Sequence, residues 1–211
     1  MAREYVHLYL DTQTDPDWTG LTAADQAVYL AVLTSPDMSW CGVAPLLPKR
    51  IVTQSSDLTL RKVTTSIEKL ARNRFLVVDS STDEVCVRAY IRRDGILKQP
   101  NVTRAMLRAL RRVRSLDIQW VLVDELVRAV MAESGRIATA RAFAEEWPEL
   151  FALVYREGFP EGFPEGFPEA MPNSPSPFPL PPSLSVVTEH LHRRLADARD
   201  RDGMPMRGAA R

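Results

Sequence analysis

The hydrophobic repeat of this chain changes from a helical to a strand period at Arg74. Over residues 60–71, apolar side chains recur at spacings of three and four, which places them on one face of a helix. After Arg74, the runs FLVVD and EVCVRAY are rich in β-forming residues, and the SSTD between them is typical of a turn. Because Thr59 is placed to cap the helix, residues 57–94 are predicted to form one helix that leads directly into a β-hairpin.

The outer face of the predicted helix is mostly basic and polar. A basic helix followed at once by a hairpin is typical of a winged helix-turn-helix, in which the helix enters the DNA major groove and the hairpin, the wing, lies on the backbone. The same pattern also fits an ordinary α+β core with a solvated charged face. On the first interpretation, the helix contacts duplex DNA through Arg61, Lys62, Thr65, Lys69 and Arg72.

The residues before this helix supply the other elements of such a domain. A helix is predicted to begin after Thr22, a good N-cap with Asp25 three residues on. Residues 42–46 suit a short strand that pairs with the hairpin, and a second helix is predicted over Pro48–Ser55 because proline fits a first helical turn. The resulting order of helix, short strand, helix, helix, strand, strand is that of a winged helix. The candidate phosphate contacts at the start of the second helix are Lys49 and Arg50.

The first twenty residues divide into two predicted parts. Residues 4–11 alternate as a strand would, with tyrosines and His7 on one face and aliphatic residues on the other. A turn-rich connector follows, and Trp18 within it is predicted to anchor the core.

The formal net charge of zero conceals a strong segregation of charge. Residues 56–114 carry a net +8, whereas residues 1–55 carry −3 and residues 115–172 carry −7. The positive field is therefore concentrated on the predicted helix, on the hairpin and on the segment that follows them. Phosphate contact requires such a concentration.

More arginines follow the hairpin. Arg88, Arg92 and Arg93 lie on or just past the predicted wing, where we expect contact with phosphate or the minor groove. After turns at Asp94-Gly95 and Gln99-Pro100, a helix capped by Asn101 is predicted, with a basic stripe along one side. That stripe is interpreted as a second DNA-facing element or as the surface of an interdomain helix, and a solvated arginine face is an open alternative. Its members are Arg104, Arg108, Arg111 and Arg112.

The fold class expected from these patterns is mainly α with a small β-hairpin. The predicted domains are a winged-helix DNA-binding domain over residues 1–115 and an α-helical extension over 116–156, containing helices over Leu116–Ser134 and from Ala138. A Pro-rich low-complexity linker follows over 157–184, with three EGFP tetrapeptides, and a short helix and tail over 185–211. More than half of the 16 prolines lie in the linker, which favours an extended, disordered segment, although its phenylalanines are alternative docking points.

Several classes of protein are not expected. No Walker-type, GxGxxG, GxSxG or HExxH motif occurs, and the two cysteines form no CxxC pattern, so neither a cofactor nor a metal is predicted. An acidic group around the hairpin resembles a nuclease site, but no lysine follows at the required spacing, and we expect no catalysis. No apolar run is long enough to cross a membrane and no signal peptide is recognisable, which predicts a cytoplasmic protein. The acidic group comprises Asp79, Asp83, Glu84 and Asp94.

Three runs carry a family resemblance: DPDWTGLTAADQAVYLAVLTSPD, GVAPLLPKR and LVVDSSTDEVCVRAYIRRDGILKQPN. Over roughly residues 4–115 the chain resembles helix-turn-helix DNA-binding proteins of actinobacterial phages and prophages. It is more distantly similar to the winged N-terminal domains of phage replisome organisers and DnaD-type initiation proteins. The resemblance implies binding of double-stranded DNA near an origin or operator and fixes no base-reading residue.

The expected role is therefore replication initiation or replisome organisation of a phage or mobile element. A transcriptional regulator and a protein-interaction adaptor are the alternatives. A replication protein, or a second copy of the chain bound through the helical extension, is the expected partner besides DNA.

Overall fold

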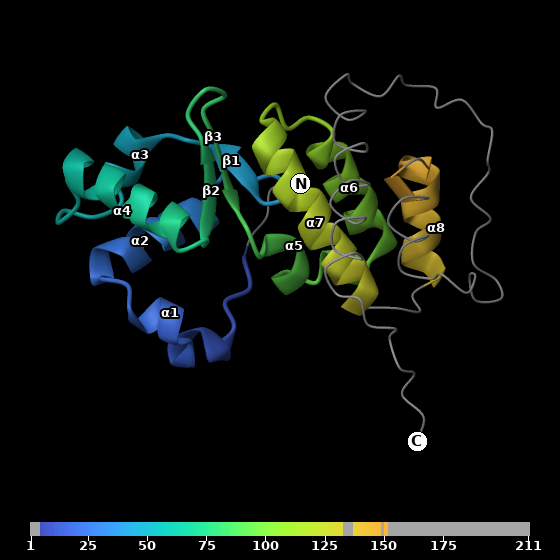
Figure 1. Ribbon diagram of the computed structural model, residues 1–211, viewed down its shortest axis with the longest axis horizontal. Helices are drawn as coiled ribbons and strands as arrows, with labels where there is room; N and C mark the ends of the chain where they lie inside the picture. The colour runs from blue at the N-terminus through green and yellow to red at the C-terminus, as the bar shows by residue number, and fades with distance from the viewer. Residues whose placement is uncertain (1–4, 133–136, 149, 152–211) are drawn as a thin grey trace, which may run out of the picture. The chain divides into compact units, whose positions relative to one another are not determined.

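The computed structural model describes residues 5–132, 137–148 and 150–151. These residues are mainly helical, with a small antiparallel sheet of three strands (Figure 1). The expectation of a mainly α fold with a small β component is therefore confirmed. The predicted linker over 157–184 and the segment over 185–211 lie outside the described residues.

Three helices pack together on one side of the sheet in Figure 1: α2 (Ala23–Leu33), α3 (Pro48–Val52) and α4 (Leu60–Arg72). The start of α2 is the predicted capping box, in which the Asp25 amide donates to Thr22 Oγ1 (3.2 Å) and the Thr22 amide donates to Asp25 Oδ2 (2.9 Å). Thr59 caps α4 as predicted, because its Oγ1 accepts from the Lys62 amide at 3.3 Å. α3 is shorter than the helix predicted over Pro48–Ser55 and ends at Val52.

The sheet contains β1 (Val43–Pro45), β2 (Leu76–Asp79) and β3 (Glu84–Val87) in the order β1-β3-β2. All pairs are antiparallel, and Cys86 at the centre lies opposite Val43 on one side and Val77 on the other. The prediction that a short upstream strand pairs with the hairpin is confirmed. Cys41 and Cys86 are buried and free, and burial raises the pKa of the Cys41 thiol to about 11, which makes that thiol unreactive.

The junction between α4 and β2 has a left-handed residue. Arg74 has φ of 62°, and the Phe75 amide donates to the Leu70 carbonyl at 2.9 Å, which closes the helix in a Schellman-type turn. The change of hydrophobic period in the sequence falls at this turn.

The N-terminal segment is not a strand. Residues 5–9 have no regular structure, and a 3₁₀ helix, η1, covers Leu10–Thr14. Their side chains contact α5 (Tyr90–Arg93) and the residue after it: His7 Nδ1 lies 2.9 Å from Asp94 Oδ1, and the Tyr9 hydroxyl donates to the Arg93 carbonyl. His7 and Tyr9, on one face of the predicted strand, therefore contact α5 and Asp94 and pair with no strand.

Trp18 is a core residue, as predicted. It lies in α1 (Pro16–Thr19) and makes edge-to-face contacts with Tyr29 of α2 and with Phe75. These contacts join the N-terminal segment to the three-helix group.

Four further elements follow α5: η2 (Ile96–Lys98), α6 (Pro100–Leu110), α7 (Leu116–Ala132) and α8 (Ile137–Glu146). Two details of the prediction are wrong. The second hairpin strand ends at Val87, because the chain turns into α5, and α6 is preceded by Gln99 as its N-cap, with Pro100 as its first residue in place of the predicted Asn101 cap. The predicted turn at Asp94-Gly95 is confirmed, since Gly95 has φ of 63°.

The later helices pack in two pairs. α7 packs on α5 and β2, and α6 packs on α8. Phe143, Trp147 and Phe151 are buried within and just after α8. Among the described residues, no helix has both the length and the apolar character needed to cross a membrane.

Candidate nucleic-acid interface

The outer face of α4 is exposed and carries basic side chains. Arg61, Lys62, Thr65 and Arg72 all lie on it, while Val63, Ile67 and Leu70 on the opposite face are buried. The side chains of Arg61 and Arg72 form no hydrogen bond or ion pair with any other described residue, and Lys62 Nζ donates only to the Asp57 carbonyl at 2.9 Å. This face is therefore available to a ligand, with Glu68 as its one acidic side chain within the helix.

Lys69 differs from the other predicted contacts of α4. Its Nζ donates to Asp25 Oδ2 at 2.7 Å, and the Ser66 hydroxyl donates to the other carboxylate oxygen at 2.7 Å. Burial by itself raises the pKa of the Asp25 carboxyl, but the hydrogen bonds from Lys69, Ser66 and Thr22 outweigh it and hold the pKa well below its usual range. The Lys69 charge is thus already paired within the protein and holds α4 against α2.

The two basic residues of α3 are both exposed. Lys49 has no ion-pair partner among the described residues, and Arg50 is paired with Asp37 in the loop after α2. Both partners of that pair are about half exposed, so the pair contributes little to stability and leaves the guanidinium accessible.

The basic residues assigned to the wing lie at its base. Arg88 Nε is 3.4 Å from Glu125 Oε1 of α7, Arg92 pairs with the other oxygen of that carboxylate, and Arg93 pairs with Asp11 at 2.8 Å. At the hairpin tip, Asp79 instead ends β2 and Asp83 lies in the turn before β3. The structure therefore separates these three arginines from the hairpin tip.

Positive charge near the hairpin tip comes from the segment between α6 and α7. Arg114 donates from its guanidinium to the Thr82 carbonyl, and its Nε lies 3.7 Å from Glu84 Oε1, while the side chain stays mostly exposed. Arg112 is exposed and has no ion-pair partner among the residues that the structure describes. Arg114 was not among the predicted site residues, because 30 positions separate it from Glu84 of the hairpin. Its only signal in the sequence was membership of the +8 segment.

Glu84, one member of the suspected acidic group, has a structural position. It is buried in β3 and accepts from the backbone amides of Arg114 (3.1 Å) and Ser115 (2.8 Å), while Ser115 Oγ in turn accepts from the Ile118 amide at 3.2 Å. The carboxylate therefore joins the hairpin to the first turn of α7. Anionic groups are favourable at a helix N-terminus.

The basic stripe of α6 faces α8. Arg104 pairs with Glu145 at 2.6 Å, and Arg108 makes a two-point contact with Glu146 at 2.8 and 2.9 Å. The Arg111 guanidinium lies 5.1 Å from the ring centroid of Trp147. Of the interpretations proposed from the sequence, an interdomain helix fits these three side chains best, because each contacts α8 or Trp147 just after it.

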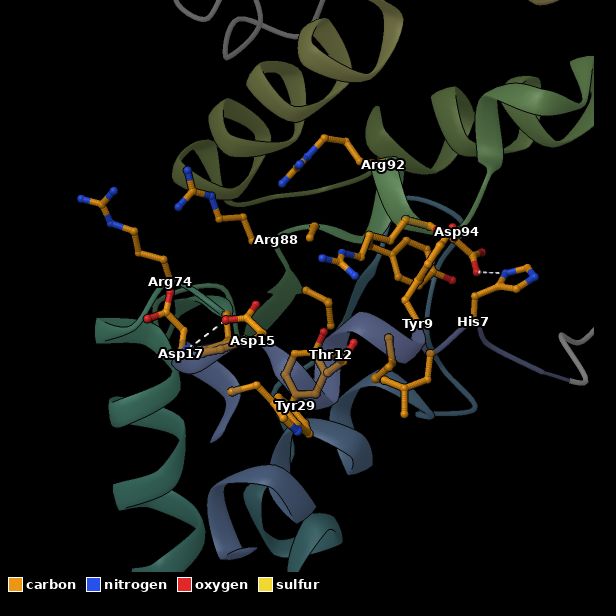
Figure 2. Close-up of a pocket in the computed structure, with 18 of the residues that line it drawn as sticks. His7, Tyr9, Thr12, Asp15, Asp17, Tyr29, Arg74, Arg88, Arg92 and Asp94 are labelled. Atoms are coloured by element: carbon orange, nitrogen blue, oxygen red, sulfur yellow. Dashed lines mark hydrogen bonds and ion pairs between the residues drawn. The ribbon is translucent and has the colours of Figure 1, made fainter. Parts of the chain in front are cut away.

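A pocket of about 420 Å³ lies between the N-terminal segment and three later parts of the chain: the turn after α4, α5 and α7 (Figure 2). Its lining includes Arg74, the base of the hairpin, α5 and part of α7. Arg88, Arg92 and Arg93, predicted to contact DNA, line this pocket together.

No protein-family model, curated protein or solved structure matches this chain.

Proposed function

We propose that residues 22–87 form a winged helix that binds duplex DNA, with α4 as the helix that enters the major groove. The observation that carries the proposal is the exposed face of α4, where Arg61 and Arg72 have no partner among the described residues. The element order α2-β1-α3-α4-β2-β3 and the sheet order β1-β3-β2 support it, because α2 and α3 hold α4 from behind and leave its basic face outward.

Lys49 and Arg50 at the start of α3, together with Arg112 and Arg114 near the hairpin tip, contact phosphate on either side of α4. Lys69, Arg104 and Arg108 are left out of the interface because of where they point. Lys69 bonds Asp25 of α2 behind α4, and the two arginines face α8, where Glu145 and Glu146 pair with them. Replication initiation is the role that the family resemblance favours, with transcriptional regulation as the alternative.

A salt titration of duplex binding tests the proposal. The logarithm of the association constant should fall linearly with the logarithm of salt concentration, by about 0.9 per phosphate neutralised. Arg61→Ala and Arg72→Ala should weaken binding, and Arg108→Ala is the matched control, because it removes a guanidinium that Glu146 already pairs with.

Fluorescence anisotropy with a labelled duplex provides the measurement. Equal losses in the Arg61→Ala and Arg108→Ala proteins would exclude α4 as the binding helix. A flat salt response would exclude DNA binding through phosphate and favour a protein-interaction adaptor.

A further inference from the structure

The pocket shown in Figure 2 has the size and lining of a small-ligand site. Its volume of about 420 Å³ lies in the range of about 300–1,000 Å³ that is usual for ligand pockets. Trp18, Tyr29 and Phe75, which contact one another edge to face, contribute aromatic surface to it. The outer face of α4 does not take part in the lining, so the site is separate from the proposed DNA interface.

One wall of the pocket holds a cluster of arginines around a single buried carboxylate. Glu125 has a side chain 1% exposed and lies beside three guanidinium groups: Arg92, Arg88 at 3.4 Å and Arg128 at 3.7 Å. Arg128 also pairs with Asp124 at 2.7 Å. Two carboxylates therefore face three guanidiniums, which leaves positive charge unneutralised in a partly buried wall.

Arg74 adds a further positive charge to this wall. Figure 2 shows the side chains of Arg74, Arg88 and Arg92 following one another along the same side of the pocket. The Arg74 side chain forms no ion pair or hydrogen bond with another described residue. Its backbone is left-handed, with φ of 62°, at the position after a helix where glycine is the favoured residue. Arginine at this position is thus unfavourable for the backbone, and no contact within the described chain offsets that.

Asp15 and Asp17 supply carboxylates to the lining as well, near the aromatic side chains (Figure 2). Asp15 accepts from the Asp17 amide as the cap of α1, and Asp17 is exposed. The pocket therefore combines a wall of guanidiniums, an aromatic surface and carboxylate acceptors. A nucleotide presents the matching groups, since it has a phosphate, a flat ring and ring-bound amino donors.

We propose that this pocket binds a nucleoside monophosphate, with its phosphate held by Arg74, Arg88, Arg92 and Arg128. Glu125 positions Arg92, which donates a hydrogen bond to its Oε2, before the phosphate arrives. The other carboxylate oxygen attracts Arg88 and Arg128 from 3.4 and 3.7 Å without a hydrogen bond. Arg74 closes the site from the end of α4. The proposal does not depend on DNA binding by α4.

The indole N–H signal of Trp18 in a ¹H–¹⁵N spectrum of the full chain provides the measurement. The protein is titrated at constant ionic strength with orthophosphate, with a nucleoside monophosphate and with a short duplex, using sodium chloride as the blank. The mononucleotide should give a saturable shift at lower concentration than orthophosphate. The opposite result is that the duplex shifts the signal while the mononucleotide binds no more tightly than orthophosphate. That result would identify the DNA backbone as the phosphate source and overturn the nucleotide assignment.

Two variants separate binding from folding. Arg74→Gly should keep or raise the unfolding midpoint, because glycine suits the left-handed turn, and should weaken the mononucleotide response at least tenfold. Arg128→Gln should weaken it several-fold, while Arg61→Ala, which removes an exposed arginine outside the pocket, should leave it unchanged. The proposal would be overturned if the wild-type protein gave no saturable shift. It would also be overturned if the Arg74→Gly and Arg128→Gln proteins both bound the mononucleotide with wild-type affinity.

Discussion

Lys69 of α4 donates a hydrogen bond to Asp25 of α2 at 2.7 Å, and the same carboxylate closes the capping box of α2. Asp25 is 4% exposed, so its charge is held almost entirely by groups of the protein. One side chain thereby fixes the start of α2 and the position of α4 against it. This relationship turns Lys69, a candidate DNA contact in the sequence, into a residue that positions the proposed reading helix.

Replacing Asp25 by alanine should destabilise the fold by about 2–4 kcal/mol, because it removes the cap and leaves the Lys69 charge without its partner. Ser66→Ala removes a single hydrogen bond to the same carboxylate and should cost about 1 kcal/mol. Urea unfolding followed by circular dichroism measures both. Equal, small losses in the two variants would show that the Asp25 network contributes little.

The same network predicts a dependence of stability on pH. The pKa of Asp25 is lower in the folded chain than in the unfolded one, so its contribution is fully present above about pH 3.9, the usual aspartate value. That contribution decreases as the pH falls toward the lower folded value. Asp25→Asn cannot titrate, and the free-energy difference between wild type and this variant should therefore narrow from pH 5 to pH 2. A constant difference over that range would contradict the lowered pKa.

Glu84 should be as important for the junction between the hairpin and α7 as Asp25 is for the contact between α2 and α4. Glu84→Ala leaves the amides of Arg114 and Ser115 without their acceptor in a buried place, and we expect a loss of about 2–4 kcal/mol in the free energy of unfolding. The neighbouring Asp83 is exposed with φ of 53°, a conformation that asparagine also tolerates. Asp83→Asn is the control and should change stability by less than about 0.5 kcal/mol. Equal losses of unfolding free energy in the two variants would show that Glu84 does not stabilise the junction between the hairpin and α7.

The contact between α6 and α8 is open to a charge-swap test. Arg108→Glu and Glu146→Arg should each speed hydrogen exchange of the α8 amides, because each places like charges together where a two-point ion pair now lies. The double variant restores opposite charges and should return exchange toward the wild-type rate. No recovery in the double variant would mean that Arg108 and Glu146 are not coupled.

The sequence allowed the local elements around the proposed interface to be predicted with little error. The capping box of Thr22 and Asp25, the Thr59 cap and the hairpin are determined by residues within a few positions of one another, so their signals are present in short windows. The strand predicted over residues 4–11 was wrong for the complementary reason. Within this segment, His7 and Tyr9 contact Asp94 and Arg93, which are more than 80 residues away and outside any short window.

The candidate site depended on partners that no local pattern reveals. Lys69 and Asp25 are 44 positions apart, and Arg104 and Glu145 are 41 apart. An amphipathic pattern shows that such a basic side chain lies on an outer face of its own helix, but not whether another element covers that face. The pocket is a stronger case, because its arginines come from four separate elements or turns.

Base reading and phosphate attraction make different predictions for the residues of the proposed interface. Arg61 and Lys62 lie in the first turn of α4, where recognition helices usually reach base edges, and their alanine variants should lose about 1–3 kcal/mol on a selected site and little on a scrambled duplex. Lys49→Ala and Arg112→Ala should weaken both duplexes alike and lower the salt slope by about one unit each. Anisotropy titrations of each variant with both duplexes give the comparison. If Arg61→Ala loses the same affinity on the two duplexes, α4 attracts DNA without reading it.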